Sequence, residues 1–462
     1  MDRSLGVDLT TGSIPRHLLS FSLPMLAGNL LHIGQNTINT IWVGHLVGEN
    51  AVGAVGVSFP VTFILIGFAL GMSMATTILV SQYYGAKDLS KVNQVINNSF
   101  SLALILGAVL SVVAVMSADS ILRFMKTPSE NFAMASSYLK ITLSGFIIFY
   151  VAFIINSALR GIGDTMTPLL FMAVTIGLNA ILDPFFIGGF GPFPHFGLKG
   201  AAWATVVSQT MGFGTAIVYL NRKNHLGAFH PKKLILNRPE TVMLFKIGLP
   251  SIIQQLIVSM GSLLIATLVN TFGAAATNAF GAVTRVDMFA IMPAMSISMA
   301  VAALTGQNLG AGKPQRVKKV FQGGLLLISS ITLFISLIAF FLSSLILTMF
   351  GLGNDARVME IGINYLKIVG ACYVVFSIGF VSNGVINGAG HTLVTMMFSF
   401  LSLWVFRIPL AWSLSRTGLG ITGIWIGIAL SFFGFSSVSL GYYLTGRWKK
   451  GLLDPNTQPL KE

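Results

Sequence analysis

An asparagine and an aspartate lie within an apolar stretch of the chain, Asn179-Ala-Ile-Leu-Asp183-Pro184-Phe-Phe-Ile187. Four residues separate Asn179 from Asp183, so a helix would place both on one face. Pro184 lacks a backbone N–H and loosens a carbonyl about one turn earlier. A carboxylate, a carboxamide and a freed carbonyl are hard oxygen ligands that suit a small cation such as Na⁺, and a desolvated carboxyl can instead carry a proton. The sequence therefore predicts an ion site here.

Acidic residues are rare inside the apolar stretches of this chain. Of fourteen acids, only Asp183 and Asp287 lie well within them. A charged side chain near the centre of a bilayer costs at least about 2.5–3.5 kcal/mol, so such residues usually have a function and a partner. The alternative for Asp183 is a structural role, in which its hydrogen bonds brace a helix kinked at Pro184.

A polar stripe precedes this region near the N-terminus. His32, Gln35, Asn36 and Asn39 recur at spacings of three and four, which places them on one helix face. They form either a buried seam between helices or the lining of a cavity opposite Asp183. In the second case His32 is another candidate proton carrier, because histidine titrates near neutrality.

Further polar residues lie in the second half. Arg285 and Asp287 occur in Thr-Arg-Val-Asp, and residues two apart on a helix do not face each other, so each is expected to pair with another helix. A structural role and a role in the substrate or proton pathway remain open for both. Arg407 and Gln255 are candidates for lining the same pathway.

The elements that hold these residues are membrane-spanning helices. Among 462 residues, 54% are hydrophobic and 9% charged, whereas soluble domains carry about 25% charged residues. Long runs without charge can each supply one or two helices of the roughly 20 apolar residues that a span requires. We predict an all-α polytopic membrane protein with twelve spans, at 15–44, 52–82, 94–117, 136–157, 165–188, 197–221, 242–271, 277–306, 319–346, 360–386, 393–415 and 420–445.

The net charge of +14 is explained by membrane orientation, so no nucleic-acid partner is expected. With the N-terminus in the cytoplasm, the cytoplasmic loops and tails hold 19 of the 28 Lys and Arg, and the external loops hold five. This asymmetry predicts that both termini are cytoplasmic, in a multi-pass protein of the plasma (inner) membrane. The N-terminal segment does not read as a secretory signal, and the one cysteine, Cys372, excludes an internal disulfide.

The two halves repeat each other. Gln82-Tyr-Tyr-Gly-Ala86 corresponds to Gln307-Asn-Leu-Gly-Ala311, and Arg160-Gly-Ile-Gly-Asp-Thr165 to Asn387-Gly-Ala-Gly-His-Thr392. Two further pairs, Leu23-Pro24 with Leu249-Pro250 and Gly197 with Gly420, keep the same order at nearly the same offset. We predict an N-terminal lobe at 1–221, a cytoplasmic loop at 222–241, a C-terminal lobe at 242–446 and a cytoplasmic tail at 447–462. Such parallel repeats are typical of transporters in which two bundles rock about a central site.

At these motifs the chain resembles the multidrug and toxic compound extrusion (MATE) family of bacterial type over almost its whole length. The resemblance rests on several pieces in order: SLPMLAGNLL, TIWVGHLVG, SQYYGAKD, NSALRGIGDTMTPL, LNAILDPFFI, GLKGAAWATVVSQ, TRVDMFAIMPAMSISMA and TGQNLGAG. It implies two pseudo-symmetric six-helix lobes of the MATE/MOP superfamily fold, and export of organic compounds by antiport with sodium ions or protons.

The resemblance also implies roles for particular residues. The family uses the asparagine and aspartate of span five for ion coupling, here Asn179 and Asp183, and adds a threonine of span six, which Thr205 matches. Many members carry an aspartate where this chain has Asn39, which can offer a carbonyl oxygen but cannot take up a proton near neutral pH. Asp183 is then the titratable carboxylate of its lobe cavity, and either Na⁺ or H⁺ fits.

The sequence therefore predicts a cation-coupled antiporter for small organic, including cationic, compounds, acting as a monomer without a cofactor. Two alternatives stay open: an exporter of one endogenous metabolite, and a lipid-linked precursor flippase of the same superfamily. An enzyme is disfavoured. Gly161-Ile-Gly-Asp164 spells the G-x-G-D of intramembrane aspartyl proteases, but it lies in a predicted cytoplasmic turn and its repeat partner lacks the acid.

Overall fold

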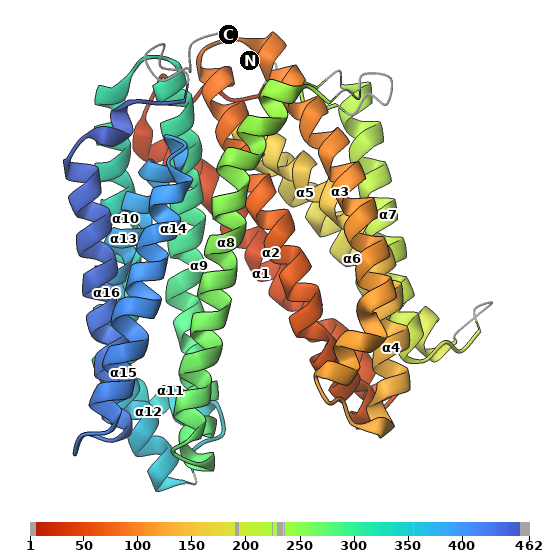
Figure 1. Cartoon of the computed structure of the whole chain (residues 1–462), viewed down its shortest axis with the longest axis vertical. Coiled ribbons are helices and arrows are strands. Elements are labelled where there is room, and N and C mark those ends of the chain that lie inside the picture. Colours follow the sequence, from red (N-terminus) through yellow and green to blue (C-terminus); the bar gives the residue numbers. More distant parts are fainter. Residues whose placement is uncertain are drawn as a thin grey trace. The chain divides into compact units, whose positions relative to one another are not determined.

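The computed structural model describes residues 6–189, 194–223, 225–228, 234, 236–353 and 355–452. Within these ranges the chain is helical and contains no strand. The helices of the first half are α1 (Ile14–Leu46), α2 (Glu49–Gly85), α3 (Leu89–Phe124), α4 (Ser129–Ser144), α5 (Phe146–Gly161), α6 (Met166–Gly188) and α7 (Leu198–Arg222). Short turns connect most of these helices (Figure 1).

The second half repeats this order with more interruptions. It comprises α8 (Arg238–Asn270), α9 (Ala274–Gly310), α10 (Pro314–Phe341), α11 (Ser343–Met349), α12 (Ala356–Ile368), α13 (Tyr373–Gly388), α14 (Thr392–Phe400), a π-helical segment (Leu401–Arg407), α15 (Ile408–Ser415) and α16 (Ile421–Leu444). Short 3₁₀ turns occupy Gly370–Cys372 and Arg447–Lys449. Each of the twelve predicted spans coincides with one helix or with a helix broken at one or two points.

Length and apolar composition support the membrane assignment. Nine helical segments of the described chain can each cross a bilayer, and α4 with α5 form a tenth that is bent by 45°. α1 and α7 have 33 and 25 residues, so they are also long enough. Both carry polar side chains among the apolar ones, and these include the candidate site residues Gln35 and Thr205.

Four interruptions of predicted spans in the described chain were not predicted: those between α4 and α5, between α10 and α11 and between α12 and α13, and the π-helical segment. Two have a visible cause. α4 ends at Gly145, where an added Cβ would lie 2.6 Å from Val206 of α7, so the break falls at a close helix contact. The π-helical segment Leu401–Arg407 precedes Pro409, which cannot donate a backbone hydrogen bond to the preceding turn. At the break between α12 and α13 the carbonyl oxygen of Gly370 accepts from the backbone N–H of Tyr373 and, over 2.7 Å, from the Ser336 hydroxyl.

By its contacts the chain divides into two compact units. The first contains the residues up to Asp8 together with Pro24–Gly248, and the second contains Leu9–Leu23 and Leu249–Glu462. Both changes of unit inside a helix fall at or beside a Leu-Pro pair of the repeat, Leu23-Pro24 in α1 and Leu249-Pro250 in α8. The first turns of α1 and α8 therefore group with the opposite half, which differs from lobes cut at 221 and 242.

Each unit has its own contacts. In the second, the backbone N–H of Leu9 donates to Gln307 over 2.9 Å, and α9 packs on α10, α12 and α13. In the first, α6 packs along α7 so closely that a Cβ at Gly200 would lie 2.1 Å from the carbonyl oxygen of Phe186. This close packing excludes water from the stretch of α6 that carries Asn179 and Asp183.

Candidate functional site

The carboxylate of Asp183 is buried inside the first unit. Its side chain has no exposed surface, and Asn179, one turn earlier on α6, donates a hydrogen bond of 3.0 Å to its Oδ1. Asn179 is also buried. The helix thus places the two residues as their spacing predicts, in surroundings where an uncompensated charge is costly.

Gln35 of α1 completes this cluster. Its Nε2 donates a hydrogen bond of 2.8 Å to Oδ1 of Asn179, whose own Nδ2 points to Asp183. The result is a directed chain of donors, from Gln35 to Asn179 to Asp183. Oδ2 of Asp183 is buried and has no hydrogen-bond partner among the described residues. One carboxylate oxygen therefore remains available for a proton or a cation.

The other expected ligands of this site are not joined to Asp183 by hydrogen bonds. The Thr205 hydroxyl donates to the carbonyl oxygen of Ala201 in its own helix, over 3.0 Å. Asn39 is partly exposed, and His32 and Asn36 are exposed. Within the described chain, Gln35 is the member of the α1 polar stripe that bonds to the cluster.

Sequence reasoning missed one neighbour of the carboxylate. Tyr138 of α4 interacts electrostatically with Asp183 and is partly buried. The only signal in the sequence was a tyrosine near the beginning of the fourth predicted span, and many tyrosines of membrane helices pack without such a role.

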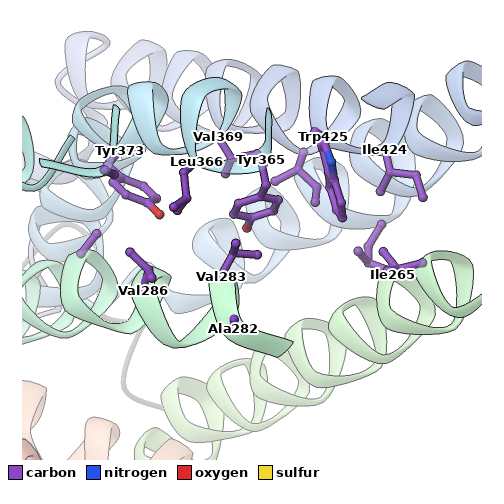
Figure 2. Packing of buried hydrophobic residues seen from close by; sticks show 14 of the residues in the cluster. Ile265, Ala282, Val283, Val286, Tyr365, Leu366, Val369, Tyr373, Ile424 and Trp425 are labelled. Carbon is purple, nitrogen blue, oxygen red and sulfur yellow. The ribbon is translucent and has the colours of Figure 1, made fainter. Parts of the chain in front are cut away.

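A second cluster surrounds Asp287 in the other unit. Tyr365 of α12 and Tyr373 of α13 each donate a hydrogen bond of 2.5 Å to it, one to Oδ2 and the other to Oδ1. Figure 2 shows the two rings on either side of Leu366, with the Tyr365 hydroxyl directed toward Val283 of α9. In an unbroken helix, the side chains of two residues eight positions apart would point in directions that differ by about 80° around the axis. The break between α12 and α13 lets both tyrosines reach one carboxylate.

The remaining candidates of this unit surround or flank the cluster. Arg407 ends the π-helical segment, donates 2.8 Å to Ser431, and stacks 5.1 Å from the ring centre of Phe432. It interacts electrostatically with Asp287 without forming an ion pair. Arg285 is exposed, whereas Asp287 points inward to the tyrosines. Gln255 is partly exposed, and its neighbour Gln254 bonds to Ser399 over 2.7 Å.

Comparison with known proteins places the chain in a family. The MatE family model matches residues 24–185 and 250–413, one match in each half. The "Probable multidrug resistance protein YpnP" of Bacillus subtilis is 31% identical over 442 residues, covering 96% of this chain and 97% of that protein. The "Probable multidrug resistance protein NorM" of Thermotoga maritima is 29% identical and covers 95% and 94%.

Solved structures agree with the sequence matches. A multidrug resistance MATE family transporter of the MOP superfamily, in an outward-facing conformation, superimposes with a TM-score of 0.88 at 25% identity, over 96% of this chain and 99% of that one. A MOP superfamily transporter from Pyrococcus furiosus gives 0.87 over 96% and 98%. The predicted fold is confirmed, and this chain belongs to the MatE family of multidrug and toxic compound extrusion transporters.

Proposed function

We propose that this transporter exports small organic compounds in exchange for a cation that binds at Asp183. The observation that carries the proposal is the free, buried Oδ2 of a carboxylate whose other oxygen accepts from Asn179. Neutralising a charge in such surroundings changes its free energy strongly. A cation that binds two conformations unequally shifts their balance, which is how an ion gradient can drive export.

The arrangement of the amides supports a proton over sodium. Asn179 presents its nitrogen to Asp183, while its oxygen accepts from Gln35. A sodium ion shared by Asp183 and Asn179 would require the Asn179 amide to turn its oxygen toward the ion. The Gln35 amide would then also have to turn, because two amide nitrogens are both donors. A proton needs only the free Oδ2.

The relatives support the class of substrate. Several bear names of multidrug export proteins, such as MepA of Staphylococcus aureus at 26% identity. We infer that small organic compounds, organic cations among them, are the cargo. A second candidate is a single metabolite, because one relative covering 92% of this chain is named a FAD transporter. The lipid-linked precursor flippase is the less supported alternative. A strongly cationic central cavity would be expected for it, whereas Arg285 and Arg407 are the only arginines of the sequence that lie well inside the predicted spans.

The cluster of Asp287 supplies a candidate step in the substrate or proton pathway. Its carboxylate accepts a hydrogen bond from a tyrosine on each oxygen, whereas Asp183 accepts one from Asn179 and its Oδ2 has no partner among the described residues. We assign Asp183 to ion coupling and Asp287 to ordering α9, α12 and α13 around the pathway. The cation would act on lobes at 1–221 and 242–446 in a monomer of the plasma membrane, with both termini in the cytoplasm.

The test is transport by purified protein in proteoliposomes loaded with a fluorescent organic cation. A pH gradient and a sodium gradient are imposed separately. We expect the pH gradient to drive efflux, and Asp183→Asn to abolish it while the protein stays folded. Asp119→Asn is the matched control, because Asp119 is a half-exposed acid of the same unit and its loss should leave gradient-driven efflux intact.

Two results would contradict this assignment. Efflux that is driven only by the sodium gradient would show that Na⁺, and not a proton, is the coupling cation. Normal efflux by folded Asp183→Asn would make Asp183 structural and move coupling to Asp287 or His32. If neither gradient moves the dye with any variant, the same vesicles should be assayed with flavin adenine dinucleotide (FAD). Transport of FAD would favour the alternative that the protein exports a single metabolite.

A further inference from the structure

A groove of about 480 Å³ lies in the second unit, between the beginning of α1 and the first turns of α10. Its walls include Ser13, Ile14 and Pro15 from α1, and Arg316, Lys319 and Leu326 from α10. The groove is separate from both buried clusters, because none of its lining residues takes part in them. Its chemistry changes along α10 from cationic to apolar.

The wall of the groove formed by Arg316 and Lys319 is cationic, and neither residue forms an ion pair with an acid of the described chain. The guanidinium of Arg316 donates to the backbone carbonyls of Thr11 and Gly12, over 2.8 and 2.6 Å. Its Nε is buried without a hydrogen-bond partner among the described residues. Lys319 is exposed and forms no ion pair with a residue of the described chain.

Carboxylates of the same unit lie elsewhere. In its described part they are Asp287, which is bonded to two tyrosines, and Asp355 and Glu360 beyond the far end of α10. α10 has 28 residues and is therefore about 42 Å long. The first turns of both α1 and α10 also contain no acid. No acid of the described chain forms an ion pair with Arg316 or Lys319, so an external anion can meet their positive charge.

At Leu326 the groove continues into an apolar face of α10. Leu326 lines the groove and is 72% exposed, and Leu333, Leu337 and Phe341 follow at spacings of seven, four and four, all exposed. Such spacings keep the side chains on one side of the helix. Leu326 lies about 10 Å along the axis from Lys319. A cationic head followed by an apolar track matches the profile of one phospholipid molecule.

We propose that this groove binds an anionic phospholipid, with its phosphate between Arg316 and Lys319 and an acyl chain along Leu326 and Leu333. A free phosphate would use the cations but not the apolar track. Because Arg316 also binds Thr11 and Gly12, the bound lipid would brace the segment that leads into α1. This binding does not depend on the ion coupling proposed for Asp183.

The test measures thermal stabilisation of the purified full chain in neutral micelles on titration with phosphatidylglycerol, phosphatidylcholine or glycerol phosphate. We expect phosphatidylglycerol to stabilise the protein more than the other two. Lys319→Gln should weaken the apparent affinity for phosphatidylglycerol about fivefold, the effect of one basic residue near an anionic lipid. The matched control is Lys318→Gln, because Lys318 is an adjacent exposed lysine that does not line the groove.

Three outcomes would overturn the proposal. Equal weakening by Lys318→Gln and Lys319→Gln would mean diffuse surface charge instead of a groove. Equal stabilisation by glycerol phosphate would identify a free-anion site. Equal stabilisation by phosphatidylcholine would remove the need for a negative headgroup. Leu326→Ser adds an independent arm, since it should weaken phosphatidylglycerol binding without changing the response to glycerol phosphate.

Discussion

Gln35 and Asn179 are 144 residues apart in the chain, yet their amides form a hydrogen bond of 2.8 Å between α1 and α6. This bond connects α1 to the buried carboxylate of Asp183, because Asn179 in turn donates a hydrogen bond to Asp183. Pro24 lies inside α1 at the point where the helix changes unit. We expect a movement of α1 to reach Asp183 through these two hydrogen bonds.

Removing the Gln35 amide is expected to weaken coupling without unfolding the protein. Gln35→Ala leaves the Oδ1 of Asn179 without its donor, and a hydrogen bond of this kind is worth about 0.5–1.5 kcal/mol, or roughly a two- to tenfold effect. The initial rate of pH-driven efflux measures the loss. Asn36→Ala is the control on the next, exposed residue. Equal rates for both variants would show that the bond between α1 and α6 has no part in transport.

The two tyrosines of the Asp287 cluster should contribute non-additively to stability. Tyr365→Phe and Tyr373→Phe each remove one hydrogen bond to a partly buried carboxylate, a loss of about 1.5–3 kcal/mol for a charged acceptor. Residues that share one partner usually couple, so the double variant should differ from the sum of the single ones. Thermal unfolding in detergent measures this.

Tyr443→Phe serves as the control for these variants. Tyr443 stacks on Phe321 and Trp448 through its ring, and Phe preserves that ring. Its melting temperature should stay near that of the parent. Strict additivity of Tyr365→Phe and Tyr373→Phe would argue that the two hydroxyls do not act on one charge.

Close packing of α6 on α7 should tolerate no side chain at Gly200. In Gly200→Ala the new Cβ would meet the backbone oxygen of Phe186 at 2.1 Å, so α6 must shift near Asp183. Gly214→Ala is the matched control on the same helix, because nothing lies within 4 Å of its Cβ. We expect a marked fall in melting temperature for the first and none for the second. Similar melting temperatures would contradict the tight contact.

The turn before α14 should make stability sensitive to mild acid. His391 lies 2.9 Å from the Tyr442 hydroxyl and 3.2 Å from the carbonyl oxygen of Lys450. Burial lowers the pKa of His391 below its ordinary value of 6.5, and the bond to Lys450 offsets part of this shift. The folded state therefore favours neutral histidine. Its contribution is complete above pH 6.5 and is lost as the pH falls through the lowered pKa.

Melting temperatures between pH 5 and 8 test this sign. The parent should lose stability below pH 6.5, whereas His391→Gln should lack that part of the pH dependence. His195→Gln, which changes an exposed histidine, should keep the profile of the parent. An unchanged acid loss in His391→Gln would assign it to other groups.

Much of this architecture could be predicted from the sequence because its causes are local. Runs without charge predict spans, and the spacing of Asn179 and Asp183 predicts one helix face, which the hydrogen bond of 3.0 Å bears out geometrically. The repeat of Gln82 and Gln307 needs no structure to be seen. The twelve spans follow from these features, whereas the family is indicated by the resemblance of motifs such as LNAILDPFFI and TGQNLGAG.

Tertiary structure decided which polar residues meet. Gln35, Asn36 and Asn39 share a stripe, but only the first reaches Asn179, because the rotation of α1 against α6 depends on packing along both helices. Tyr365 and Tyr373 reach Asp287 because α12 breaks before α13. The groove beside Lys319 forms from segments about 300 residues apart. Helical periodicity fixes the directions of side chains within one helix, whereas contacts between helices depend on the shape of every packed surface, which no single sequence window contains.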